Sequence, residues 1–148
     1  MVTVKQLIKE KGEQVWTIAP EATVYDALKM MSEKNVGALP VIDNDRLIGV
    51  ISERDYARKV ILQGKSSLQT PVRDIMTSKV IYVRPEQKVS DCMALMTDKR
   101  VRHLPVLDEA EKLAGIISIG DVVKEIMAEQ KVFIQDLMNY IEGRGYGQ

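Results

Sequence analysis

The chain has 148 residues, and its 21 basic and 21 acidic side chains give a formal net charge of zero at pH 7. Proteins that grip nucleic acid usually carry a basic excess, so nucleic acid is not expected as a partner. Apolar residues make up 45% of the sequence, which is enough to bury a core and argues against disorder. A single cysteine and a single histidine exclude an internal disulfide and a Cys/His zinc site within one chain. The sequence has no signal-peptide pattern and no apolar run of the ~20 residues that span a bilayer, which favours a cytoplasmic protein without a membrane partner.

The sequence is internally duplicated. Residues 15–43 align with residues 80–108 at a constant offset of 65 (80 − 15). One extra residue within 109–112 raises the offset to 66, so that "GVISERDY" at 49–56 matches "GIISIGDV" at 115–122. Agreement over this length with a single slip indicates a repeat of one structural unit.

Both repeats are predicted to fold as a strand, a helix, two strands and a second helix. The predicted elements lie at 15–18, 23–35, 38–43, 47–52 and 53–63, and again at 80–83, 88–100, 103–108, 113–118 and roughly 119–142. Apolar side chains at helical spacing, such as Val24, Leu28 and Met31, indicate the first helix of the unit. Short β-branched runs closed by proline indicate its first strand.

A helical lead-in precedes each repeat, at 4–12 and at 72–77, and a polar linker covers 64–71. We therefore predict a first unit over residues 1–65 and a second over residues 66–148, which includes the linker and the long C-terminal helix. A unit of about 60 residues buries too little surface to be stable alone, so the two are expected to share a core. The predicted fold class is α+β, with two duplicated β-α-β-β-α units packed with pseudo-two-fold symmetry.

Each repeat carries Gly-aliphatic-aliphatic-Ser-x-x-Asp where its second helix begins, with Ser52 and Asp55 in the first copy and Ser118 and Asp121 in the second. Ser-x-x-Asp before an apolar helix is close to a capping box, so it has a purely structural interpretation. It also has a functional one. A helix N-terminus attracts phosphate, and an ionised Asp accepts hydrogen bonds from the two adjacent hydroxyls of a ribose. The pattern leaves both interpretations open.

Counter-charge for a phosphate is available in the second repeat. Arg102 and His103 stand at the start of a predicted strand, whereas the first repeat has Gly37 and Ala38 at the matching positions. The two sites therefore need not bind the same ligand or bind it equally. Other basic residues beside the first Ser-x-x-Asp are favoured to form a solvated helix face: Arg54, Arg58 and Lys59.

The segments "VGALPVID" and "RHLPVLD", together with the two Ser-x-x-Asp runs, resemble a tandem pair of cystathionine-β-synthase (CBS) domains, often called a Bateman module. The resemblance covers about residues 10 to 127. It implies two clefts between the repeats that bind adenosine compounds: AMP, ADP, ATP, S-adenosylmethionine or NAD. It implies no catalytic cofactor and no metal, and it favours a homodimer.

The resemblance also implies roles for single residues. Asp55 and Asp121 would bind the ribose hydroxyls. The phosphate would be bound by Ser52, Ser118, Arg102 and His103, with Arg54 adding charge beside the first pattern. The base would lie against Gln14, Val15 and Trp16 in one cleft and against Thr77, Lys79, Val80 and Ile81 in the other, with Val36, Gly37 and Val101 close by. For Trp16, packing between the repeats is an equally good interpretation.

The leading hypothesis is a non-catalytic sensor that binds AMP, ADP or ATP and signals through a homodimer or a separate effector protein. The alternatives are an NAD(H)-binding redox sensor, a protein-interaction scaffold and a binder of RNA ends. An enzyme is disfavoured, because the sequence has no Gly-rich phosphate loop and no metal-binding motif. The C-terminal helix has more apolar residues than one short unit needs, so it is predicted to make a dimer contact or to cover the partner's edge.

Overall fold

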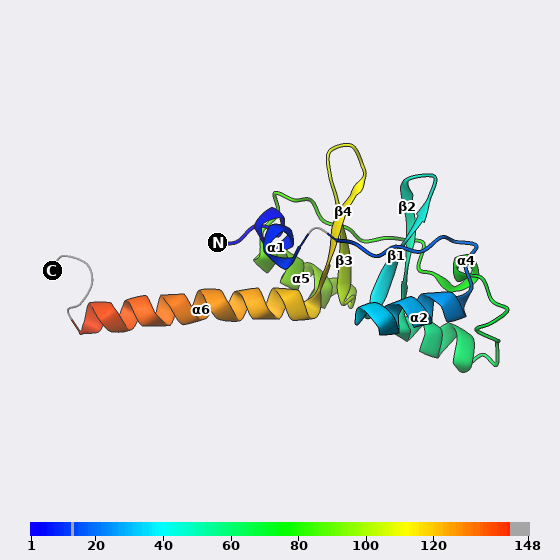
Figure 1. The fold of residues 1–148 in the computed structure, drawn as a ribbon. Coiled ribbons are helices and arrows are strands. Elements are labelled where there is room, and N and C mark those ends of the chain that lie inside the picture. Colours follow the sequence, from blue (N-terminus) through cyan, green and yellow to red (C-terminus); the bar gives the residue numbers. More distant parts are fainter. Residues whose placement is uncertain (13, 143–148) are drawn as a thin grey trace.

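The computed structural model describes residues 1–12 and 14–142 (Figure 1). Its helices are α1 (Val4–Lys11), α2 (Val24–Lys34), α3 (Glu53–Tyr56), α4 (Val72–Ile75), α5 (Val89–Lys99) and α6 (Ile119–Ile141), and a π-helical segment η1 (Ala57–Ile61) follows α3. Its strands are β1 (Ala38–Asp43), β2 (Arg46–Ser52), β3 (His103–Leu107) and β4 (Leu113–Ser118). The α+β class and the duplication are confirmed.

Each repeat contains one antiparallel hairpin, and the two hairpins have equivalent registers. Leu39 pairs with Ile51 in the first, and Leu104 pairs with Ile117 in the second. All four side chains are fully buried, so each hairpin turns one apolar face into the core of its own repeat.

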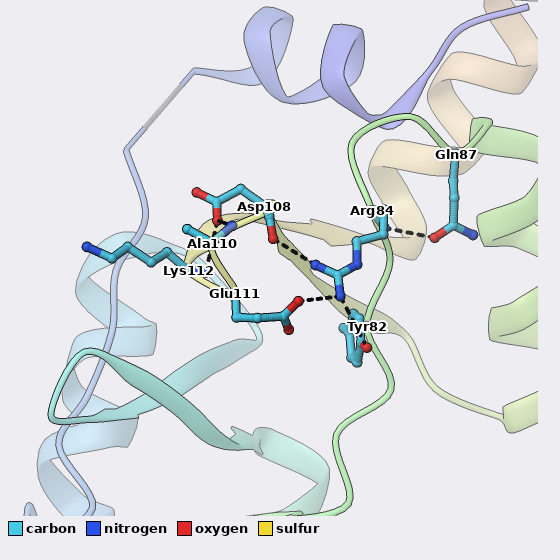
Figure 2. A network of polar contacts seen from close by, with 7 residues as sticks. All are labelled: Tyr82, Arg84, Gln87, Asp108, Ala110, Glu111 and Lys112. Atoms are coloured by element: carbon cyan, nitrogen blue, oxygen red, sulfur yellow. Dashed lines mark hydrogen bonds and ion pairs between the residues drawn. The ribbon is translucent and has the colours of Figure 1, made fainter.

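The extra residue of the second repeat lies between the end of β3 at Leu107 and the start of β4 at Leu113, in the turn that Figure 2 shows. The first hairpin turns through Asn44 and Asp45, both with positive φ, as the tight turn of two strands requires. The second has a longer turn, in which the Asp108 carboxylate accepts hydrogen bonds from the backbone N–H groups of Ala110 and Lys112.

The guanidinium of Arg84 holds this longer turn in place. It donates to the Asp108 carbonyl at 2.7 Å and to the Glu111 carboxylate at 2.6 Å, and it lies over the Tyr82 ring (Figure 2). Repeat one has Ala19 at the position of Arg84, so this clamp belongs to the second repeat. The polar groups of this network are hydrogen-bonded to one another. We therefore interpret the network as one that stabilises the turn.

The predicted first strands, 15–18 and 80–83, are wrong in extent. Only Ile18 and Val83 pair with the sheets, each through a single parallel bridge, to Val41 and Val106. Ile18 donates to the carbonyl of Pro40. The next rung toward the N-terminus would need an N–H from Pro40, or from Pro105 in the second repeat, and proline has none.

The predicted helix at 53–63 is also divided. Only Glu53–Tyr56 is α-helical, and the chain then continues through η1 to Ile61. Gly64 follows with φ +68°, which ends this segment. The helices predicted at 23–35, 88–100 and 119–142 are confirmed to within one residue at each end.

The lead-in helices pack on the opposite repeats. Val4 and Leu7 of α1 lie in the core of the second repeat, and Val72 and Ile75 of α4 lie in the core of the first. Figure 1 shows the chain passing from α1, beside α5, across the molecule to α2. The division into 1–65 and 66–148 stays a prediction, and the packing crosses it.

A glycine in each second hairpin strand allows this crossing. A Cβ on Gly49 would lie 2.5 Å from the sulfur of Met76 and 3.1 Å from the carbonyl oxygen of Thr77. A Cβ on Gly115 would lie 3.0 Å from the side chain of Ile8. The glycine of the repeated motif therefore makes room for the lead-in of the other repeat.

Helix α6 is the longest element, with 23 residues, and its far half lies clear of the other elements in Figure 1. Among the described residues, no helix combines the length and the apolar character that crossing a membrane requires.

Candidate functional site

The two Ser-x-x-Asp patterns form capping boxes, as the structural interpretation predicts. The Asp55 N–H donates to Ser52 Oγ, and the Ser52 N–H donates back to the Asp55 carboxylate at 3.0 Å. Ser118 and Asp121 repeat the arrangement, with the return bond at 2.8 Å. These bonds orient both carboxylates at the start of a helix, where the backbone dipole favours negative charge.

The first carboxylate is nearly enclosed, since the Asp55 side chain is 12% exposed. Thr77 Oγ1 donates to Asp55 Oδ1 at 3.2 Å, and Lys59 Nζ lies 3.0 Å from the same oxygen. Lys59 also donates to the Ile75 carbonyl at 3.1 Å. The segment that leads into the second repeat therefore supplies part of the surroundings of the first repeat's carboxylate.

The second carboxylate pairs with a lysine from α1. Lys11 Nζ lies 2.6 Å from Asp121 Oδ2 and also donates to the Ile116 carbonyl. Burial by itself would raise the pKa of Asp121, but the hydrogen bonds from Lys11 and from the Ser118 amide outweigh it, and the pKa lies below its ordinary value. Asp121 is thus held ionised, in the state that can accept hydroxyl hydrogen bonds.

His103 lies at the seam between the repeats. A Cβ on Gly37 would lie 3.4 Å from two atoms of the His103 ring and 3.3 Å from the carboxylate of Glu53. Burial lowers the pKa of His103, and the positive charges of Lys11 and Arg102 lower it further, against the effect of Asp121. The imidazole is therefore close to groups of both repeats and of α1.

The residues that follow the two capping serines differ between the repeats. Glu53 and Arg54 follow Ser52, and the guanidinium of Arg54 donates across the seam to the carbonyl of Arg100 at 3.3 Å. The second repeat has Ile119 and Gly120 at the matching positions. One side therefore carries charge where the other is apolar or open.

The remaining predicted residues divide between the two cores. Trp16 and Val36 pack against the core of the first repeat, and Lys34 Nζ lies 4.1 Å from the centre of the Trp16 ring. Ile81 and Val101 pack against the core of the second. Of the other residues predicted to lie against the base, Val15 and Val80 are half-buried, and Gln14 and Lys79 are exposed. Arg102, predicted to bind the phosphate, is also exposed. Their binding roles stay predictions, and of the predicted walls Thr77 reaches a motif carboxylate.

The sequence analysis did not identify Lys11 as a site residue, and it favoured a solvated helix face for Lys59, which instead pairs with Asp55. Lys59 stands four residues after Asp55, a spacing that brings opposite charges together on a helix, so its pairing was accessible from the sequence. Lys11 is 110 residues from Asp121, and no local pattern links them.

We also searched the described residues for surface hollows and for groups of metal ligands. Two hollows lie along α6, and neither is lined by Ser52, Asp55, Ser118 or Asp121. Within residues 1–12 and 14–142, no three His, Cys, Asp or Glu side chains are grouped as ligands for a metal ion.

Known proteins are similar to this chain over most of its length. The CBS domain-containing protein CBSX3, mitochondrial, of Arabidopsis thaliana is 46% identical over 154 residues, which cover 97% of this chain and 73% of the relative. The structure of a protein with CBS domains from Burkholderia ambifaria is 53% identical, with a TM-score of 0.83 over 87% of this chain and 96% of that one.

A more distant likeness concerns the fold alone. The CBS domain pair of protein MJ0100, solved in complex with 5′-methylthioadenosine and S-adenosyl-L-methionine, is 23% identical, with a TM-score of 0.77 over 86% of this chain and 98% of that one.

The profile of the CBS domain matches the present sequence twice, over residues 2–61 and 72–128. The chain therefore belongs to the CBS domain family and carries two copies of the domain.

Proposed function

We propose that this chain is a non-catalytic regulatory module that binds adenosine nucleotides, such as AMP, ADP or ATP, at the seam between its repeats. The observation that carries the proposal is the position of the two motif carboxylates. Each is fixed at a helix N-terminus and is reached by a side chain from the lead-in of the opposite repeat, Thr77 at Asp55 and Lys11 at Asp121.

The chemistry of the second site fits a nucleotide. An ionised carboxylate accepts hydrogen bonds from both hydroxyls of a ribose, and the N-terminus of α6 favours an anion. Lys11, Arg102 and His103 lie near enough to interact electrostatically. A ribose that displaces the Lys11 ammonium from Asp121 would free that ammonium for a phosphate oxygen.

The first site offers a different environment. Lys59 and Thr77 already engage Asp55, and the carboxylate of Glu53 lies at the seam beside Gly37. The second site has three basic side chains near its carboxylate, Lys11, Arg102 and His103, so we propose that it has the higher affinity for charged nucleotides.

The regulatory output would follow from the contact between repeats. A ligand shifts a conformational equilibrium only by its differential affinity for the two states. A nucleotide that replaces the Lys11–Asp121 ion pair changes how α1 is held against the second repeat. The MJ0100 pair shows that this fold can hold adenosine compounds, and an effector protein or a second copy would read the change.

Thermal unfolding of nucleotide-free protein with AMP, ADP, ATP, NAD, NADH and S-adenosylmethionine tests the proposal. A ligand at 100 times its dissociation constant adds about 2.7 kcal/mol per site, which raises the midpoint by roughly 5–10 °C. Asp121→Ala should abolish the shift. Asp26→Ala is the control, because Asp26 holds the same third position in α2 and its N–H likewise donates to the capping side chain, Thr23. A shift for no ligand in a folded sample would overturn the proposed function.

A further inference from the structure

One oxygen of the Asp121 carboxylate is already fully hydrogen-bonded. Asp121 Oδ2 accepts from the Ser118 N–H at 2.8 Å and from Lys11 Nζ at 2.6 Å. Each carboxylate oxygen offers about two lone-pair positions, so these two bonds fill Oδ2. When a carboxylate binds the two adjacent hydroxyls of a ribose, one on each oxygen, it needs a position on both. Lys11 therefore occupies the position that one ribose hydroxyl would take.

The ammonium of Lys11 has a second acceptor at this site. It also donates to the Ile116 carbonyl at 3.0 Å, and Ile116 pairs with Pro105 in the second hairpin. An ammonium has three donors, so its bond to Ile116 does not depend on its bond to Asp121. The ammonium can thus leave Asp121, stay beside it on the Ile116 carbonyl, and donate to another acceptor.

The first carboxylate is occupied more completely. Asp55 Oδ2 accepts from the N–H and the hydroxyl of Ser52, and Asp55 Oδ1 lies within 3.2 Å of both Thr77 Oγ1 and Lys59 Nζ. The Asp55 side chain is 12% exposed, against 24% for Asp121. Among the described residues, bonds fill both oxygens of Asp55 but only one oxygen of Asp121. A single exchange, that of Lys11, would therefore open Asp121 to a ribose.

We propose that Lys11 makes the second site select phosphorylated over unphosphorylated adenosine, by moving its ammonium from Asp121 to a phosphate oxygen when the ribose binds. This inference rests on the proposed function and adds which adenosine compounds the second site prefers. Adenosine displaces the ammonium from Asp121 without offering it an anionic acceptor. AMP displaces it in the same way and offers its phosphate. Lys11 thus competes with the nucleoside and binds the nucleotide.

The surroundings of Lys11 support a phosphate as the new acceptor. The pKa of His103 is lowered by burial and then by the positive charges of Lys11 and Arg102, so both charges lie within electrostatic reach of the ring. A phosphate that accepts a hydrogen bond from Lys11 would therefore also be attracted by Arg102. The Lys11 side chain is 38% exposed, which leaves it room to move.

An NMR titration of the full chain with AMP, followed at the His103 imidazole in phosphate-free buffer, measures binding at the second site. Displacement of AMP by adenosine then gives the dissociation constant of adenosine at the same site. Lys11→Met should raise the dissociation constant of AMP about tenfold or more, the contribution of a charge-assisted hydrogen bond. It should lower that of adenosine about two- to fivefold, because a partly exposed ion pair no longer competes. The preference for AMP should therefore fall roughly 20-fold or more.

Lys9→Met is the matched control, because Lys9 is an exposed lysine in the same last turn of α1. It should leave both dissociation constants within about twofold of the wild type. Far-UV circular dichroism checks that both variants are folded.

The two ligands distinguish the exchange from simpler roles of Lys11. If Lys11→Met weakens AMP and adenosine equally, the role of Lys11 is structural. If it weakens AMP and leaves adenosine unchanged, Lys11 attracts the phosphate without competing for Asp121. Either result overturns the proposal, as do unchanged AMP binding in Lys11→Met and the same shifts in Lys9→Met. A wild type that binds neither ligand overturns the proposed function and this inference with it.

Discussion

Gly49→Ala should destabilise the protein more than Gly115→Ala, although the two glycines hold equivalent positions. The added Cβ at residue 49 would lie 2.5 Å from the sulfur of Met76 and 3.1 Å from the Thr77 carbonyl oxygen. That oxygen accepts a hydrogen bond from Val50 N at 3.0 Å, and the Thr77 N–H donates to Val50 at 2.9 Å. The backbone at Thr77 is thus bonded in both directions and cannot move away freely.

The expected change in the free energy of unfolding is estimated from two opposing effects. Forcing extra volume into a packed contact costs about 1–3 kcal/mol, and replacing glycine by alanine in a strand returns about 0.5–1 kcal/mol. We expect a net loss of about 1–2 kcal/mol for Gly49→Ala. At Gly115 the nearest atoms all belong to the side chain of Ile8, with its terminal Cδ1 closest at 3.0 Å, and none is a backbone atom, so Gly115→Ala should stay within about 1 kcal/mol of the wild type.

Equilibrium unfolding in urea measures both changes. Far-UV circular dichroism and the fluorescence of Trp16, the single tryptophan, should give coincident transitions if unfolding is two-state. Equal losses at the two positions, or a more stable Gly49→Ala, would refute the close packing of the lead-in segments that places Thr77 at Asp55.

Three further predictions concern titratable groups. Lys11→Met should raise the pKa of Asp121, because it removes the ammonium that donates to that carboxylate; carboxyl NMR shifts measure this, and an unchanged titration would contradict the ion pair. The free energy of unfolding should fall as the pH drops below 6.5, the ordinary pKa of histidine. The pKa of His103 is lowered in the folded state, so the unfolded state binds more protons in this range. This part of the pH dependence, measured by urea unfolding, should be absent in His103→Gln. Burial raises the pKa of the Cys92 thiol to about 11, so at pH 8 a disulfide reagent should modify it only as fast as the protein opens, and rapid reaction of the native state would contradict its burial.

The duplication made most of the secondary structure predictable. Local signals recur in both repeats, such as the buried pairs Leu39–Ile51 and Leu104–Ile117, and each copy supports the interpretation of the other. The first strands, 15–18 and 80–83, were predicted too long, because the sequence pattern of a strand does not show which residues will lie beside it in the sheet. Their neighbours would have to supply the N–H groups that Pro40 and Pro105 lack.

The pairing of lead-ins with repeats could not be predicted locally. The matching apolar residues of α1 and α4 identify equivalent helices, but no local pattern tells which repeat each helix packs on. The observed exchange brings Lys11 to Asp121 and Thr77 to Asp55. These two polar contacts of the candidate site therefore depend on tertiary packing.

The titration of His103 with and without AMP tests the central claim most directly. His103 is the single histidine, so its imidazole signals in an NMR spectrum are assigned without ambiguity. A phosphate bound at the seam beside His103, Arg102 and Lys11 should raise the lowered pKa of His103 saturably, because a nearby negative charge favours the protonated ring. Adenosine should leave that pKa nearly unchanged, and Asp121→Ala should abolish the effect of AMP. A His103 pKa that AMP does not move at saturating concentration would contradict the claim that a nucleotide phosphate binds between the repeats.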